Sequence, residues 1–177
     1  QPFRYLAHNV EINTLRGNVR QMEAREGALG GGLLGEDVAK LPPVIEPGGS
    51  DSAALDNVLE LLFRAGRSLP HAMMMLMPQA WGERYPMGPD IRGFFEYHAG
   101  LMEPWDGPAA VVFSDGEQVG ALLDRNGLRP ARYAVTHDGL VVLASESGVL
   151  DLAPASIAER GALRPGQMLV ADLASHR

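Results

Sequence analysis

The sequence predicts an α+β fold in which helices and antiparallel strands occupy different parts of the chain. Up to about Met102, apolar residues recur mostly every three or four positions, which is the spacing of one helix face. From Pro108 onward they alternate at every second position, and Asp-Gly pairs at 115–116 and 138–139 divide the strands into hairpins. Elements segregated in this way pack as separate layers.

The composition is that of an ordinary globular domain. Of the 177 residues, 46% are apolar and 21% are charged, so we expect one domain spanning residues 1–177. The net charge of −7, with scattered basic residues, argues against a nucleic-acid partner. No apolar run approaches the roughly 18 residues of a membrane helix, and no signal-peptide pattern is present, so no membrane partner is expected. The absence of cysteine excludes disulfides, thiolate metal sites and a Cys nucleophile among these residues.

The chain opens with a predicted strand, a polar turn and a helix. The aromatic-rich alternation that begins at Phe3 indicates a half-buried strand ending near residues 8–9. A helix should follow, with Asn13 or Thr14 as its N-cap and an end near residues 25–27. Its apolar face is formed by Leu15, Val19 and Met22.

Asn9 is the first candidate functional residue, because it lies where the predicted strand ends. An Asn side chain can stabilise its own turn by bonding to nearby backbone groups, which is the simpler interpretation. Alternatively, its carboxamide can donate to an anion, and a donor aimed at a developing oxyanion lowers a reaction barrier by roughly 3–4 kcal/mol.

A long loop separates the first helix from the second. The Gly- and Pro-rich residues 28–50 predict this loop, which either folds over a pocket or is a surface excursion. A helix with a broad apolar face is then predicted to begin at Ser50 and Asp51 and to end at Gly66. Asp51 lies in the first turn, where the helix dipole favours an acidic residue by about 0.3–1 kcal/mol.

Residues 68–102 contain three further elements. A short helix is predicted at Ser68, with Pro70 near its first position. The apolar run Met73–Met77 is short enough for a buried strand. Asp90 can cap a helix that continues to about Met102. His98 on the apolar side of that helix should be hydrogen-bonded and partly buried, and no other ligand at suitable spacing indicates a metal site.

The last third of the chain should form an antiparallel meander. Two hairpins and a final strand carry the alternating pattern: Ala109–Ser114 with Gln118–Asp124, Arg132–Thr136 with Leu140–Ser145, and then Gln167–Asp172. Between them, Pro154–Arg160 indicates a short helix or turn.

Three arginines gather near Asn126-Gly127, the turn between the hairpins: Arg125, Arg129 and Arg132. They can form an anion site for a substrate carboxylate. The alternative, which the local sequence favours, is that they pack against Asp124 or Glu146.

Four blocks of the sequence resemble a known family: FRYLAHNVEINTLRGNVRQMEAREG, GGSDSAALDNVLELLFRAGRSLPHAMMMLMPQAW, YHAGLMEPWDGPAAVVFSDG and LDRNGLRPARY. In this order they resemble the class II glutamine amidotransferase domain of the glutamate synthase large subunit, from Phe3 to about Leu173. The resemblance implies an N-terminal-nucleophile hydrolase fold, in which two antiparallel sheets are sandwiched between helical layers.

The resemblance also implies a set of site residues. In that family a Cys at the mature N-terminus attacks the side-chain amide of glutamine, giving a thioester and ammonia. Asn9 matches the family's oxyanion-hole Asn, and Val10 stands where the family has Gly and would contribute its backbone N–H. A β-branched residue would be strained there if the turn required a positive φ. Asp51 matches the Asp that binds the α-amino group of glutamine, as a carboxylate fixed at a helix start can.

On this resemblance we expect a partial domain whose N-terminal Cys segment lies outside the chain, since the sequence begins at Gln1 and contains no Cys. The chain alone should then be inactive. Its expected partners are glutamine, the missing N-terminal segment and the downstream synthase domains, in a cytoplasmic enzyme that transfers ammonia reductively to 2-oxoglutarate. No cofactor is expected in this segment; FMN and an iron–sulfur cluster are expected elsewhere in the parent. Two alternatives are a catalytically dead module that binds glutamine or a regulatory partner, and a structural fragment without a ligand.

Overall fold

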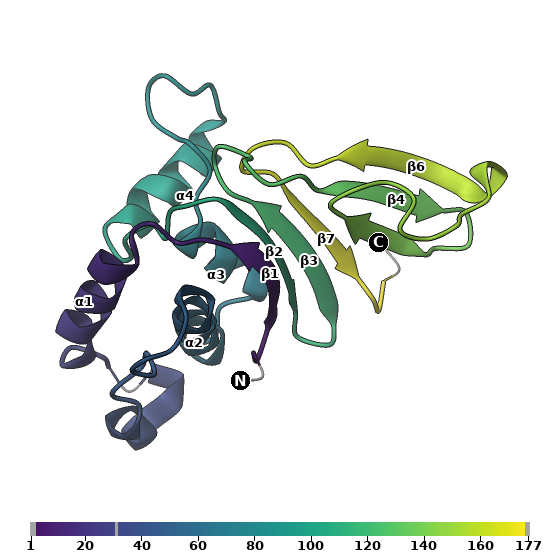
Figure 1. Ribbon diagram of the computed structural model, residues 1–177. Helices are drawn as coiled ribbons and strands as arrows, with labels where there is room; N and C mark the ends of the chain where they lie inside the picture. The colour runs from purple at the N-terminus through teal and green to yellow at the C-terminus, as the bar shows by residue number, and fades with distance from the viewer. Residues whose placement is uncertain (1–2, 31, 176–177) are drawn as a thin grey trace.

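The computed structural model describes residues 3–30 and 32–175, which form two antiparallel sheets with the α-helices gathered on one side (Figure 1). The first sheet has the strand order β1-β2-β3-β7, and the second has the order β5-β4-β6. The strands of the first sheet are β1 Leu6–Val10, β2 Ala109–Ser114, β3 Gln118–Leu123 and β7 Met168–Asp172. Those of the second are β4 Arg132–Thr136, β5 Val141–Ala144 and β6 Ile157–Ala162.

Two of the helices begin behind a serine that caps them. The helices are α1 Leu15–Glu26, α2 Asp51–Arg64, α3 Leu69–Leu76 and α4 Pro89–Ala99, with 3-10 segments at Gly32–Lys40 and Pro154–Ser156. The Ser50 hydroxyl accepts the backbone N–H of Ala53 at 3.2 Å, and the Ser68 hydroxyl accepts that of His71 at 3.4 Å. Each serine satisfies a donor that has no partner within its own helix. None of the helices in the described residues is long and apolar enough to cross a membrane.

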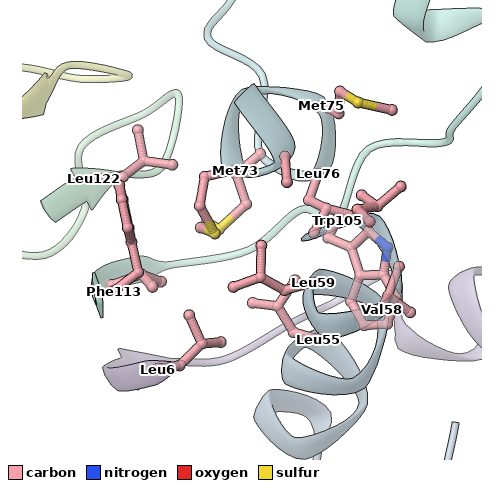
Figure 2. Close-up of a cluster of buried hydrophobic side chains, with 14 of the residues drawn as sticks. Leu6, Leu55, Val58, Leu59, Met73, Met75, Leu76, Trp105, Phe113 and Leu122 are labelled. Carbon is pink, nitrogen blue, oxygen red and sulfur yellow. The ribbon is translucent and has the colours of Figure 1, made fainter. Parts of the chain in front are cut away.

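The main core lies between the helices and one face of the first sheet. Figure 2 shows apolar side chains of α2 and α3 facing those of β1, β2 and β3, with the Trp105 indole beside α2. The fully buried members include Leu55, Val58 and Leu59 of α2, Met73 and Leu76 of α3, and Val111 and Phe113 of β2. Truncating one of these side chains to Ala would cost about 2–5 kcal/mol.

The other face of the first sheet packs against the second sheet. A smaller cluster joins Ala121 and Leu123 of β3 to Ala131 and Leu163, with Tyr133 and Leu143 of the second sheet packed around them. Residues of β2 alternate between the two clusters, as a strand buried on both faces requires. The described residues therefore form a helix layer and two stacked antiparallel sheets, and the predicted α+β fold with two antiparallel sheets is confirmed. Within these residues the α-helices lie on one side only, so the second helical layer that the resemblance implied is not among them.

The apolar run Met73–Met77 was predicted as a strand, and this is wrong. The run continues the helix that begins after Ser68, through Leu76. Because α3 is buried on most sides, its apolar residues are continuous and show no helical period. The later helix begins at Pro89, with Gly88 and not Asp90 as its N-cap, and ends at Ala99, short of the predicted end.

Both predicted hairpins are present, but they do not form one meander. The β2–β3 hairpin belongs to the first sheet and the β4–β5 hairpin to the second. The stretch Pro154–Arg160 was predicted as a helix or turn, yet only its first residues are helical and the rest belongs to β6. The final strand, β7, pairs with β3 and closes the first sheet. These pairings are set by long-range packing, which local patterns do not report.

Candidate functional site

Asn9 and Val10 lie inside β1, because the strand runs further than predicted. Asn9 is paired with Ala110 and Val10 with Ala109 in the antiparallel ladder with β2. A residue in such a ladder has an extended backbone, which suits a β-branched side chain. Val10 therefore does not need a positive φ, and the strain considered for this position does not arise.

The backbone N–H of Val10 points out of the edge of the sheet. Glu11 N–H donates to Pro108 O at 2.9 Å, and Ser114 N–H donates to Tyr5 O at 3.1 Å. Backbone bonds in an antiparallel pair occur at every second residue, so the alternate position Val10 turns its N–H away from β2. Because β1 is the edge strand of this sheet in the described residues, that N–H faces outward.

The side chain of Asn9 lies on the sheet face that is turned towards the second sheet. Leu6 and Val10 pack into the helix-side core, and successive side chains alternate between faces. Asn9 accordingly shares a face with its partner Ala110, which packs against the smaller cluster. Asn9 is exposed, so its carboxamide is accessible at the end of the strand.

Asp51 approaches the same strand end from the helix side, whereas the Asn9 side chain lies on the opposite face of the strand. One carboxylate oxygen accepts the backbone N–H of Ile12 at 2.8 Å, and the other accepts that of Ser52 at 2.7 Å. Ile12 follows Val10 by two residues, and its N–H faces out of the same edge. A carboxylate has about four acceptor positions, so Asp51 retains capacity for a further donor such as an ammonium group.

Within the described residues, the ion pairs of these arginines involve acids other than Asp124 and Glu146. Arg125 forms an ion pair with Asp106 at 2.5 Å, and the Arg129 guanidinium lies 3.9 Å from the Glu11 carboxylate. Arg132 is an exposed residue of β4. Arg125 and Arg129 therefore point to different acids, and the Arg129 Nε is buried with no hydrogen-bond partner among the described residues.

The comparison with known protein families shows to which family this chain belongs. The model of the class-II glutamine amidotransferases matches residues 1–177, the whole chain. This chain belongs to that family. Family members are enzymes, and the chain matches the glutamine amidotransferase part of its relatives.

Several relatives are glutamate synthases. The chain is 50% identical over 176 residues to the NADPH-dependent large chain of Bacillus subtilis, covering 99% of this chain and 12% of that protein. It is 51% identical to the NADH-dependent enzyme of Saccharomyces cerevisiae, covering 97% of this chain and 8% of that protein. It is 53% identical to the ferredoxin-dependent enzyme of Cyanidium caldarium, covering 98% of this chain and 11% of that protein. The chain thus spans about one tenth of the length of these relatives.

A solved structure shares the fold. The glutamine phosphoribosylpyrophosphate amidotransferase of B. subtilis, complexed with ADP and GMP, superposes with a TM-score of 0.50 at 18% identity. The match covers 96% of this chain and 27% of that chain. This likeness confirms the N-terminal-nucleophile hydrolase type of the fold.

Two carboxylates of this amidotransferase chain were not predicted to be buried acceptors of backbone hydrogen bonds. Asp56 is 3% exposed and accepts the backbone N–H groups of Arg4 at 2.6 Å and Tyr5 at 3.0 Å. Asp124 is equally buried, and its oxygens accept three backbone N–H groups: Ala109 at 3.0 Å, Asn126 at 2.9 Å and Leu128 at 3.2 Å. An acidic residue on the apolar face of a predicted helix was the available signal for Asp56.

The predicted burial and hydrogen bonding of His98 are confirmed. Its Nδ1 lies 2.7 Å from the carbonyl oxygen of Phe94, so Nδ1 carries the proton. The Nε2 atoms of His98 and His71 lie 2.8 Å apart, so a proton on one of them is shared with the other ring in a hydrogen bond. Burial lowers the pKa of His71, and charge on His98 and on Arg67 lowers it further. The described residues contain no group of three or more His, Cys, Asp or Glu that could hold a metal ion.

Proposed function

We propose that this chain supplies the oxyanion-stabilising and ammonium-binding parts of a glutaminase site within a glutamate synthase. The observation that carries the proposal is the shared edge of β1, where Val10 N–H faces outward and Asp51 holds Ile12 N–H at 2.8 Å. Two residues along an extended strand span about 6.8 Å. That separation is comparable with the distance between the ammonium nitrogen and the side-chain amide oxygen of an extended glutamine.

The proposed roles follow from the charge that each step develops. The ammonium group of glutamine pairs with the Asp51 carboxylate, which places the side-chain amide near the end of β1. A Cys thiolate from outside these residues adds to the amide carbon, and the C=O electron pair moves onto oxygen. The Asn9 carboxamide and the Val10 N–H donate to that oxyanion. The C–N bond then breaks, the amide nitrogen takes a proton and leaves as ammonia, and water hydrolyses the thioester to glutamate.

The parent reaction is proposed from the relatives. Three of them are named as NADPH-, NADH- and ferredoxin-dependent glutamate synthases, and ammonia from this site would be transferred reductively to 2-oxoglutarate. FMN and an iron–sulfur cluster would be held by other parts of such an enzyme, which we place in the cytoplasm. The catalytically dead glutamine-binding module is the second candidate, favoured by the absence of Cys from these residues.

Ammonia release from glutamine tests the proposal. The 177-residue chain should release none above the buffer rate, because it contains no Cys. The same chain preceded by an N-terminal segment with the family's Cys should release ammonia, and a Cys→Ala version of that polypeptide should not. Release by the Cys-free chain would refute the assignment of the nucleophile. Glutamine binding without turnover in the longer polypeptide would favour the dead module.

A further inference from the structure

The turn that follows the proposed oxyanion strand is held by a segment nearly a hundred residues away in sequence, Pro104–Pro108. Glu11 N–H donates to Pro108 O at 2.9 Å, and Asn13 N–H donates to Asp106 O at 2.8 Å. These bonds continue the β1–β2 ladder beyond the end of β1. The backbone of Val10 therefore enters a turn whose position is set by Pro104–Pro108 on one side and by Asp51 on the other.

Side chains extend this attachment into α1. The Thr14 hydroxyl accepts Asp106 N–H at 3.0 Å and donates to Asn18 Oδ1 at 2.6 Å. The carboxamide of Asn18, which is 1% exposed, donates in turn to Pro104 O at 3.0 Å. Both ends of the turn are thus bonded to Pro104–Pro108, and the Thr14 hydroxyl and the Asn18 carboxamide both have hydrogen-bond partners.

The segment itself is anchored in the core. The Trp105 side chain is 2% exposed beside Val58 of α2, and its backbone N–H donates to Leu76 O at 2.7 Å (Figure 2). On its outer side, Asp106 is paired with Arg125. A segment fixed in this way transmits the rigidity of the core to the turn.

Gly107 permits the close approach of the two backbones. Its φ is +152°, and a Cβ at this position would lie 1.9 Å from Glu11 O and 3.0 Å from Asn13 N. Both neighbours are backbone atoms, so no side-chain rotation can relieve the overlap. Any larger residue must displace either Pro104–Pro108 or the turn after Val10.

We infer that Pro104–Pro108 is a positioning element for the proposed oxyanion donors and that Gly107 is the residue on which this positioning depends. The inference rests on the proposed glutaminase function. The backbone of Asp51 is held by α2, which begins behind the Ser50 cap, so Asp51 keeps this anchor even when the turn that carries its partner Ile12 moves. Displacing the turn should therefore impair stabilisation of the transition state more than it impairs glutamine binding.

The test compares Gly107→Ala with Gly116→Ala in the polypeptide that carries the Cys segment. Gly116 is a matched control: it lies at the other end of β2 with a φ of +91°, and a Cβ there meets no atom within 4 Å. Gly107→Ala should lower kcat by roughly 100-fold with little change in KM, the effect of a displacement of about 1 Å. Gly116→Ala should leave kcat unchanged. Equal effects of the two variants on kcat would overturn the inference.

Thr14 provides a milder second variant. Thr14→Val removes the hydroxyl that joins Asp106 to Asn18, whereas Thr14→Ser retains it. The Val variant should lower kcat and the Ser variant should restore it. Equal kcat in the Val and Ser variants would contradict a role for this attachment.

Amide exchange in the 177-residue chain separates this inference from the proposed function. The N–H groups of Glu11 and Asn13 should exchange slowly in the unmodified chain and in Gly116→Ala, and faster in Gly107→Ala. Unchanged exchange in Gly107→Ala would refute positioning even if glutaminase activity is found. If the Cys-containing polypeptide releases no ammonia, the proposed function fails, and the exchange rates still decide whether Gly107 fixes the turn.

Discussion

Asp51 accepts the backbone N–H of Ile12 at 2.8 Å, across 39 positions of the sequence. The bond joins the first residue of α2 to the chain immediately beyond β1, so the start of a helix and the end of an edge strand are held together. Since Val10 N–H faces out of the same edge, the carboxylate proposed to bind substrate also helps to fix the backbone proposed to stabilise the oxyanion.

Asp51→Asn should separate these two roles. The amide oxygen of Asn can still accept Ile12 N–H, although its NH₂ then faces Ser52 N–H, and the charge that binds an ammonium group is lost. A hydrogen bond to a charged group contributes about 1.5–3 kcal/mol, so the KM for glutamine should rise roughly 10- to 100-fold in the Cys-containing polypeptide. Steady-state ammonia release and thermal melting of the same samples measure both effects.

Asp56→Asn is the matched control, because Asp56 lies one turn and a half further along α2 and bonds only backbone groups among the described residues. Its carboxylate accepts two N–H groups, and an amide can accept only one of them without placing its own NH₂ against the other. This variant should lose about 1–3 kcal/mol of stability with no specific rise in KM. A KM that rises equally in both variants would argue against substrate binding by Asp51.

Val10→Gly should not raise kcat, although the resemblance implies Gly at this position. Val10 is extended in β1 and offers its backbone N–H in either form. The glycine variant should lose about 1 kcal/mol of stability through greater freedom of the unfolded chain. Ammonia release and urea unfolding check the two halves of this prediction. A higher kcat for the glycine form would show that the catalytic conformation of this residue differs from the strand described above.

Protonation of His71 should destabilise the fold as the pH falls. Its folded-state pKa is lowered by burial and by nearby charge, so the unfolded chain takes up this proton more readily. The stabilising contribution is fully present above the unfolded pKa of about 6.5 and is lost as the pH falls through the folded value. Urea unfolding across this range measures the loss. His71→Gln should flatten the profile, whereas His137→Gln, at an exposed turn, should not; identical profiles for all three would contradict the assignment.

Local signals in the sequence predicted the elements that depend on local chemistry. The Asp115-Gly116 and Asp138-Gly139 pairs predicted both hairpins correctly, because Asp-Gly pairs readily adopt the backbone conformation of a tight turn. The uniformly apolar run Met73–Met77 gave no period and was assigned wrongly. The division of strands between two sheets could not be predicted, since β1 pairs with a strand about a hundred residues away.

In the candidate site, too, part of the arrangement could be predicted from the sequence and part could not. Asn9, Val10 and Asp51 were found by resemblance to the family, not by spacing. The structure adds the backbone direction of Val10 and the Asp51–Ile12 bond, which are properties of pairing and packing. The attachment of Pro104–Pro108 to the turn could not be predicted from the sequence. A glycine that permits a close approach of two backbones cannot be distinguished, in a sequence, from any other glycine in a turn.

The turnover of Asn9→Ala tests the central claim most directly. In the polypeptide that carries the Cys segment, removing an oxyanion donor should lower kcat for glutamine hydrolysis by roughly 100- to 1,000-fold. The KM should change little, because the donor acts on the transition state. A kcat equal to that of the unmodified polypeptide, with the fold intact by amide exchange, would contradict the placement of the oxyanion at the end of β1.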